Sequence, residues 1–144
     1  MSNVLEELAD RLQLAGVVYF SAHEIAFLGG SHHLGIAKNT PPPLEVLDDL
    51  VKVAKVADMI RAEAGMPLMV VSAYRSWSYN SYVGGAKKSM HLKGKALDLA
   101  PVDGGKMARL KLTAEHLWNI RKVKGGLGVY KTFIHVDIGR YRRW

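Results

Sequence analysis

The hydrophobic residues of three stretches, 4–15, 44–64 and 106–120, recur every three or four positions. This spacing predicts three amphipathic helices, because it places the apolar side chains on one face of each helix. Gly16 and Gly65 follow the first two stretches and are typical signals for the end of a helix. The middle helix is expected to be the longest.

Two other parts of the chain have no such periodicity. Residues 28–43 and 75–89 are rich in glycine, proline and small polar residues, and we expect them to be loops. Before the first of these loops, Ser21 precedes Glu24 by three residues, which is the spacing of a capping box. This pair predicts the start of a short helix.

Two short stretches predict strands: 68–74 is apolar and β-branched, and 95–101 has Ala96, Asp98 and Ala100 on one face and Leu97 and Leu99 on the other. The stretch 125–139 is expected to form two more strands around a turn near Lys131 and Thr132. Strands and helices are mixed along the chain without βαβ alternation. The sequence therefore predicts an α+β fold, with a small antiparallel sheet flanked by helices.

Length and composition narrow the class of protein. The 144 residues suit one domain, 1–144, and the chain is 49% hydrophobic and 23% charged, as in ordinary globular proteins. The absence of cysteine restricts any metal site to His, Asp and Glu ligands. No stretch is long and apolar enough to insert in a membrane, and Glu6, Glu7 and Asp10 are unlike a secretion signal. We therefore expect synthesis in the cytoplasm.

The formal net charge of +7 favours an anionic partner, such as nucleic acid, anionic lipid or an acidic cell-wall polymer. The basic residues are scattered apart from the ending at 139–144, a distribution more typical of a solvated surface than of a docking stripe. The sequence contains no recognisable nucleic-acid-binding motif. We therefore expect no nucleic-acid partner.

Asp98 stands in the middle of an apolar predicted strand, where a buried carboxylate needs a partner. One interpretation is an ion pair with Lys93 or Lys95. The other is a metal ion shared with His91 and His135, because two imidazoles and one carboxylate suit a catalytic Zn²⁺ that keeps one position for water. The spacing of these residues does not decide between the two interpretations.

Several motifs resemble one family. "SMHLKGKALD" matches the SxHxxGxAxD signature of the zinc D-Ala-D-Ala carboxypeptidases, peptidase family M15, and "FIHVD" resembles its second metal motif. Further blocks over residues 17–144 resemble the compact, often phage-borne branch of that family. The resemblance implies the fold shared with the hedgehog signalling domain. It also implies one Zn²⁺ per chain, held by His91, Asp98 and His135.

The same resemblance implies a role for Arg75, and the residue types around it in the predicted loop indicate roles for others. Arg75 would bind a substrate carboxylate or position the scissile carbonyl, since a guanidinium matches both chemically. Ser89 would donate a hydrogen bond within the site, or act only as a turn former. Tyr82, together with Trp77 and Tyr79, would line the substrate groove, although packing is the more frequent use of such aromatics.

The general base is where the sequence departs from the family. Many relatives carry an acidic residue three positions before the last histidine, or a histidine two before it, and here Thr132 and Phe133 occupy those positions. Asp137 is the replacement that we predict, because it shares a strand face with His135. Its alternative role is to orient His135 or His91 from behind.

The resemblance thus implies a zinc peptidase that acts on peptidoglycan stem peptides, as a D-Ala-D-Ala carboxypeptidase or as an endopeptidase of endolysin type. A monomer is favoured. Action at the bacterial cell wall would then follow from phage lysis or delivery by a virion. The alternative is a phage-tail or wall-binding module that keeps the fold and the metal without catalysis.

Overall fold

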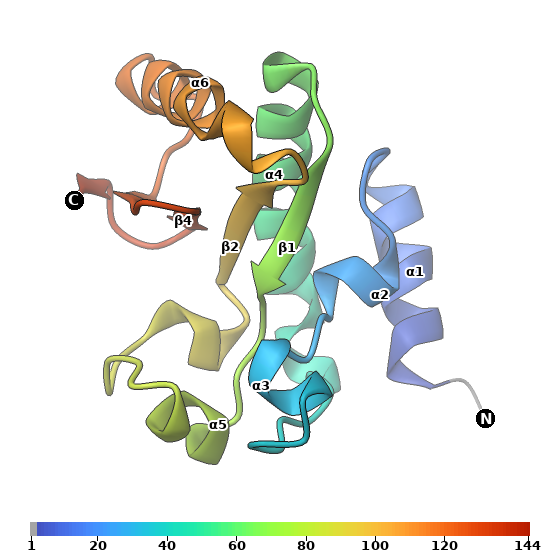
Figure 1. Ribbon diagram of the computed structural model, residues 1–144. Coiled ribbons are helices and arrows are strands. Elements are labelled where there is room, and N and C mark those ends of the chain that lie inside the picture. The colour runs from blue at the N-terminus through green and yellow to red at the C-terminus, as the bar shows by residue number, and fades with distance from the viewer. Residues whose placement is uncertain (1–2) are drawn as a thin grey trace.

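A single five-stranded sheet organises the fold, and the α+β prediction is confirmed. The computed structural model describes residues 3–144 and orders the strands β1-β2-β4-β3-β5 (Figure 1). The strands are antiparallel to their neighbours except β5, which runs parallel to β3. Their bounds are Leu68–Ser72 (β1), Ala96–Pro101 (β2), Gly126–Val129 (β3), Ile134–Asp137 (β4) and Arg142–Arg143 (β5).

The three long helices predicted from periodicity are present in the structure. The α-helices of residues 3–144 are Val4–Leu14 (α1), Ala22–Ile25 (α2), Gly30–His33 (α3), Leu47–Ala64 (α4), Trp77–Tyr82 (α5) and Met107–Asn119 (α6). A 3₁₀ turn precedes α4 and another precedes α6, and the predicted capping box of Ser21 and Glu24 caps α2. None of the helices in this part of the chain could cross a membrane.

The core lies between the sheet and the two longest helices. The helix α4 runs behind β1 and β2 (Figure 1), contacts β2 and β4, and buries Leu50 and Ile60 completely. The helix α6 packs beside it against β2 and β3. Leu97 and Leu99 of β2 point into this core, whereas Asp98 between them points to the other face of the sheet. The site therefore lies on the face that these helices leave uncovered.

Three short elements were not predicted. The helices α3 and α5 form inside the predicted loops, and β5 forms in the basic ending. The side chain of Ser76 accepts a hydrogen bond from the backbone N–H of Tyr79, which caps α5. The strand β1 ends at Ser72, two residues early, after a register shift that begins at Val70. These elements are too short for a hydrophobic period to indicate them.

Candidate metal centre

Two neighbouring strands and one 3₁₀ turn position the three predicted metal ligands. Asp98 of β2 pairs directly with His135 of β4, so the register places both side chains on the same face of the sheet. His91 lies in the turn Met90–Lys93, which ends at Gly94 with a positive φ of 66°. A Cβ on Gly94 would come within 2.9 Å of the Val46 side chain, so this turn requires glycine.

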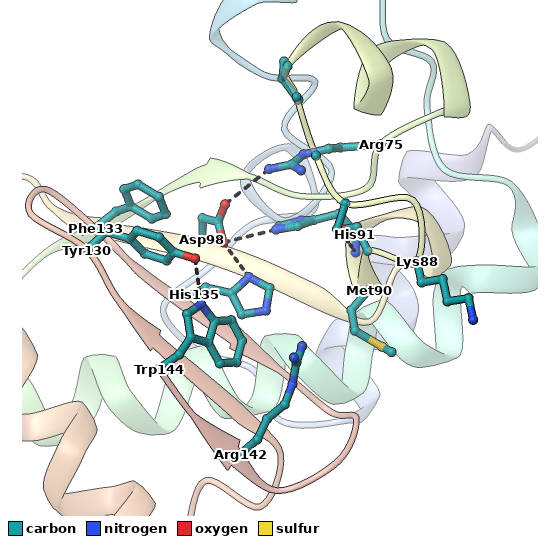
Figure 2. A pocket seen from close by; sticks show the side chains of 15 residues that line it. Arg75, Lys88, Met90, His91, Asp98, Tyr130, Phe133, His135, Arg142 and Trp144 are labelled. Atoms are coloured by element: carbon teal, nitrogen blue, oxygen red, sulfur yellow. Dashed lines mark hydrogen bonds and ion pairs between the residues drawn. The ribbon is translucent and has the colours of Figure 1, made fainter.

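The three side chains converge on one point. Their candidate ligand atoms lie within 4.8 Å of one another (Figure 2). Asp98 Oδ1 is 3.1 Å from His91 Nε2 and 3.0 Å from His135 Nδ1, and all three residues are buried. Asp98 thus pairs with these histidines, and with Arg75 through Oδ2 at 3.5 Å, rather than with Lys93 or Lys95.

The outer nitrogen of each imidazole is held by an acceptor. His91 Nδ1 lies 2.8 Å from the carbonyl oxygen of Ala73, and His135 Nε2 lies 2.8 Å from Asp137 Oδ2. Because both partners only accept, each outer nitrogen carries the proton and donates it. In a neutral imidazole the inner nitrogen then presents a lone pair to Asp98.

This donor set fits a divalent cation. Two lone pairs and a carboxylate oxygen at about 3 Å repel one another unless a positive charge lies between them. Imidazole nitrogen and carboxylate oxygen are ligands of Zn²⁺, and fixing the outer nitrogen is how proteins orient such histidines. The geometry therefore suits one Zn²⁺ on His91, Asp98 and His135.

The two histidines differ in basicity. Burial, with smaller effects of Arg75 and His135, lowers the pKa of His91. Burial acts in the same direction on His135, but hydrogen bonds with Asp137 and Asp98 outweigh it and raise the pKa of His135. Burial alone would raise the pKa of Asp98, but both histidines hold that pKa well below its usual range, because their inner nitrogens donate to Asp98 when the rings are protonated. Asp98 is therefore ionised.

Arg75 is fixed beside the ligands by residues that the sequence analysis missed. Its Nε donates to Ser72 Oγ at 3.0 Å, and its Nη1 donates to Asn80 Oδ1 at 3.2 Å. A Cβ on Gly85 would come within 2.0 Å of Asn80 Oδ1, so position 85 requires glycine. Ser72 and Asn80 carry no sequence signal of their own, because Ser72 ends β1 and Asn80 lies in α5, and they meet Arg75 only in the folded chain.

A cavity of about 640 Å³ opens in front of the ligands. Arg75, Lys88 and Ser89 lie along its edge, and its aromatic lining consists of Tyr130, Phe133 and Trp144. The ring of Tyr130 stacks on Phe133 with centroids 4.6 Å apart, and the ring of Trp144 lies 5.2 Å from that of His135. The cavity is therefore open to a substrate and is lined by both cationic and aromatic side chains.

The aromatic residues predicted for the substrate groove do not line this cavity. Tyr82 and Trp77 are exposed on α5 and do not line the cavity, and Tyr79 is buried with its hydroxyl against Gly29. By contrast, Ser89 does line the cavity. Its Oγ also accepts a hydrogen bond from the backbone N–H of His91 at 3.2 Å, so it caps the turn as well.

Asp137 lies behind His135 and does not line the cavity. Besides binding His135, it accepts hydrogen bonds from the backbone N–H groups of Gly126 at 3.0 Å and Gly139 at 2.9 Å. These contacts support the orienting role of Asp137 over the role of general base. Phe133 lines the cavity without any acid-base group, as the sequence had indicated.

A buried His-Asp-His set beside an open cavity, on an α+β scaffold, could hold a single metal ion of the kind that hydrolytic enzymes use. The comparison with protein families agrees. The model of the peptidase M15 family matches residues 18–137. The chain therefore belongs to this peptidase family, as its motifs indicated.

Two curated relatives resemble part of the chain. A protein of Haemophilus influenzae named probable peptidoglycan L,D-endopeptidase MepK is 43% identical over 82 residues, which cover 52% of this chain and 41% of that protein. Peptidoglycan L,D-endopeptidase MepK of Escherichia coli K12 is 33% identical over 85 residues, which cover 54% and 43%. The matches thus span less than half the length of these relatives.

Proposed function

We propose that the chain is a zinc-dependent peptidase that hydrolyses a peptide bond in the stem peptides of peptidoglycan. The convergence of His91, Asp98 and His135 on one point, beside an open cavity, carries this proposal. Membership of the M15 family and the names of the two relatives support it. When bound, zinc would polarise the scissile carbonyl and activate a water molecule at neutral pH.

The chain prepares the histidines for this role before any metal binds. Ala73 and Asp137 hold the outer nitrogens, so the inner nitrogens are already aimed at Asp98. Arg75 holds Asp98 Oδ2 and leaves Oδ1 to the histidines. Such preorganisation lowers the cost of assembling the site.

The cations of the cavity suit a substrate with carboxylates. Arg75, Lys88 and Arg142 line it, and Asp98 is the only acidic residue among the described residues that do so. Stem peptides carry free carboxylates, to which a guanidinium can donate two parallel hydrogen bonds. The formal net charge of +7 also favours an acidic cell wall.

The bond cleaved is either internal or C-terminal. The names of the relatives favour an endopeptidase, and a D-Ala-D-Ala carboxypeptidase is the second candidate. A place in the phage-borne branch, with action during lysis, would suit either activity.

Zinc-loaded protein incubated with purified peptidoglycan tests the proposal. Mass spectrometry of the products separates internal cleavage from the release of D-alanine, and Asp98→Asn should abolish both. Binding of the wall without products would instead identify a wall-binding module. There is a physical reason to test for that outcome, because Thr132 and Phe133 supply no general base.

A further inference from the structure

The hydroxyl of Tyr130 is fixed in the cavity by two contacts. The ring stacks on Phe133 at an interplanar angle of 9°, which sets its orientation. The Oη accepts a hydrogen bond from Trp144 Nε1 at 2.7 Å. All three residues line the cavity of the candidate metal centre.

The chemistry of the pair determines the direction of the hydrogen bonds. An indole N–H only donates, so Tyr130 Oη must be the acceptor in this contact. The hydroxyl hydrogen of Tyr130 is then left to donate elsewhere. No acceptor for it is found among residues 3–144. The cavity thus receives a hydrogen-bond donor that the fold has already oriented.

This donor lies in the same cavity as the candidate metal ligands. The ring of Trp144 packs 5.2 Å from the ring of His135, and Figure 2 shows the Tyr130 hydroxyl directed toward the indole on that side of the cavity. Trp144 can lie there because residue 128 is glycine, where a Cβ would come within 2.6 Å of the indole. Arg75 approaches the site from the other side of Asp98.

We infer that Tyr130 is a catalytic residue, whose hydroxyl donates a hydrogen bond to the substrate oxygen that becomes negative when the scissile carbonyl is attacked. Tyr130 keeps its proton, so the step is a hydrogen bond and not a proton transfer. The inference rests on the proposed function and adds an oxygen-binding group that the family motifs did not indicate. A bond of this kind strengthens as the charge on the oxygen grows.

Tyr130→Phe tests the inference, because it removes only the hydroxyl and keeps the stacked ring. Two uncleavable stem-peptide analogues serve as ligands of the zinc-loaded protein. In the first, a phosphinate replaces the scissile peptide bond, and its charged oxygens mimic the attacked carbonyl. In the second, an ethylene isostere, an ethylene group replaces that bond and offers no oxygen. We expect calorimetry to show a loss of about 10-fold or more in phosphinate affinity. Affinity for the isostere and zinc content should stay within about two-fold.

Two further variants control for other causes. Tyr141→Phe also removes a tyrosine hydroxyl, but this one donates to the carbonyl of Trp118 outside the cavity. It should therefore leave both affinities unchanged. Trp144→Phe removes the indole N–H that orients Tyr130 and should cause a smaller, selective loss for the phosphinate.

The outcomes separate this inference from the proposed function. The inference is wrong if Tyr130→Phe binds the phosphinate as tightly as wild type does. It is also wrong if Tyr130→Phe loses affinity equally for the phosphinate and the isostere, because that result would indicate a role of Tyr130 in the shape of the cavity. Wild type that does not prefer the phosphinate would overturn it even if peptidoglycan is hydrolysed. A selective loss in Tyr130→Phe without hydrolysis by wild type would support the contact and refute the proposed function.

Discussion

His91 and His135 offer their inner nitrogens to the same point, yet the chain holds them in different ways. His135 lies in a central strand with a carboxylate, Asp137, behind it, whereas His91 lies in a short turn with the carbonyl of Ala73 behind it. Their pKa values are shifted in opposite directions, up for His135 and down for His91. Burial lowers the pKa of His91, whereas at His135 the carboxylates of Asp137 and Asp98 outweigh burial.

The two supports also differ in construction. Asp137 is fixed by two backbone N–H groups, and a Cβ on Gly126 would come within 2.5 Å of its carboxylate. The turn of His91 depends on the Ser89 cap and on a hydrogen bond from the backbone N–H of Arg75 to the carbonyl of His91 at 3.0 Å. We expect variants of the His91 support and of the His135 support to show how much each contributes to zinc binding.

The largest effect is expected from removing either histidine. His91→Ala and His135→Ala should each lower zinc affinity by more than about 100-fold, beyond the loss caused by changing an outer acceptor. Competition with a chromophoric chelator measures this affinity. His116→Ala, an exposed position on α6, should bind zinc like wild type. Retained affinity in either ligand variant would show that the ion binds elsewhere.

Asp137→Asn would make the support of His135 uncharged, like that of His91. Asparagine has only one side-chain oxygen, so its NH₂ group, which donates, must face either the imidazole N–H or the backbone N–H groups, which also donate. His135 then loses part of its support, and we expect zinc affinity to fall about 10–100-fold. The matched control is Asp58→Asn, since Asp58 also accepts from two backbone N–H groups, those of Val18 and Tyr19, far along the chain from the ligands. An unchanged affinity in Asp137→Asn would show that the carboxylate is not needed.

The pKa difference predicts how zinc affinity depends on pH. Zinc binds neutral imidazole, so protons compete with it. Because the pKa of His135 is raised, competition begins above about pH 6.5, the ordinary value for histidine, and His91 contributes only at lower pH. Affinity should fall about tenfold per pH unit below the pKa of His135. In Asp137→Asn this decline should begin at lower pH, and an unshifted onset would contradict the explanation.

The smallest effect is expected for Ser89→Ala, which removes the cap of the His91 turn. The loss should be about 0.5–2 kcal/mol in the free energy of unfolding, with a change of a few fold in zinc affinity. Ser21→Ala removes the cap of α2, away from the site, and should lose similar stability without changing zinc affinity. Thermal unfolding with and without zinc distinguishes the two.

The fold could be predicted where elements are long enough to show a period. The helix α4 spans five turns, so its buried positions repeat several times along the sequence. The helix α5 has six residues, WSYNSY, with no apolar period, and only the serine before it could have indicated a helix start. The strand β5 has two residues and exists because β3 offers it a partner.

The convergence of His91, Asp98 and His135 was indicated by the family motifs, because the spacing of these residues alone did not decide between a metal site and an ion pair. The partners of Arg75 were not indicated, since Ser72 and Asn80 come from β1 and α5 and meet only after folding. Tyr82 was expected among the aromatic residues of the cavity, but its side chain is exposed to solvent, although Asn80 contacts Arg75 and Val83 lines the cavity. Trp144, which does contact the site, is 69 residues from Arg75 in the chain.

The pairing of β5 with β3 affects the choice of the C-terminal boundary for a recombinant fragment of this chain. The family match ends at residue 137, just after the last metal ligand, but Arg142 and Trp144 form part of the cavity. A fragment trimmed at that boundary would keep every metal ligand while losing one side of the substrate cavity. Because it also loses Gly139, whose backbone N–H holds Asp137, we expect such a fragment to bind zinc less tightly than the longer chain and to lack the lining that Arg142 and Trp144 provide.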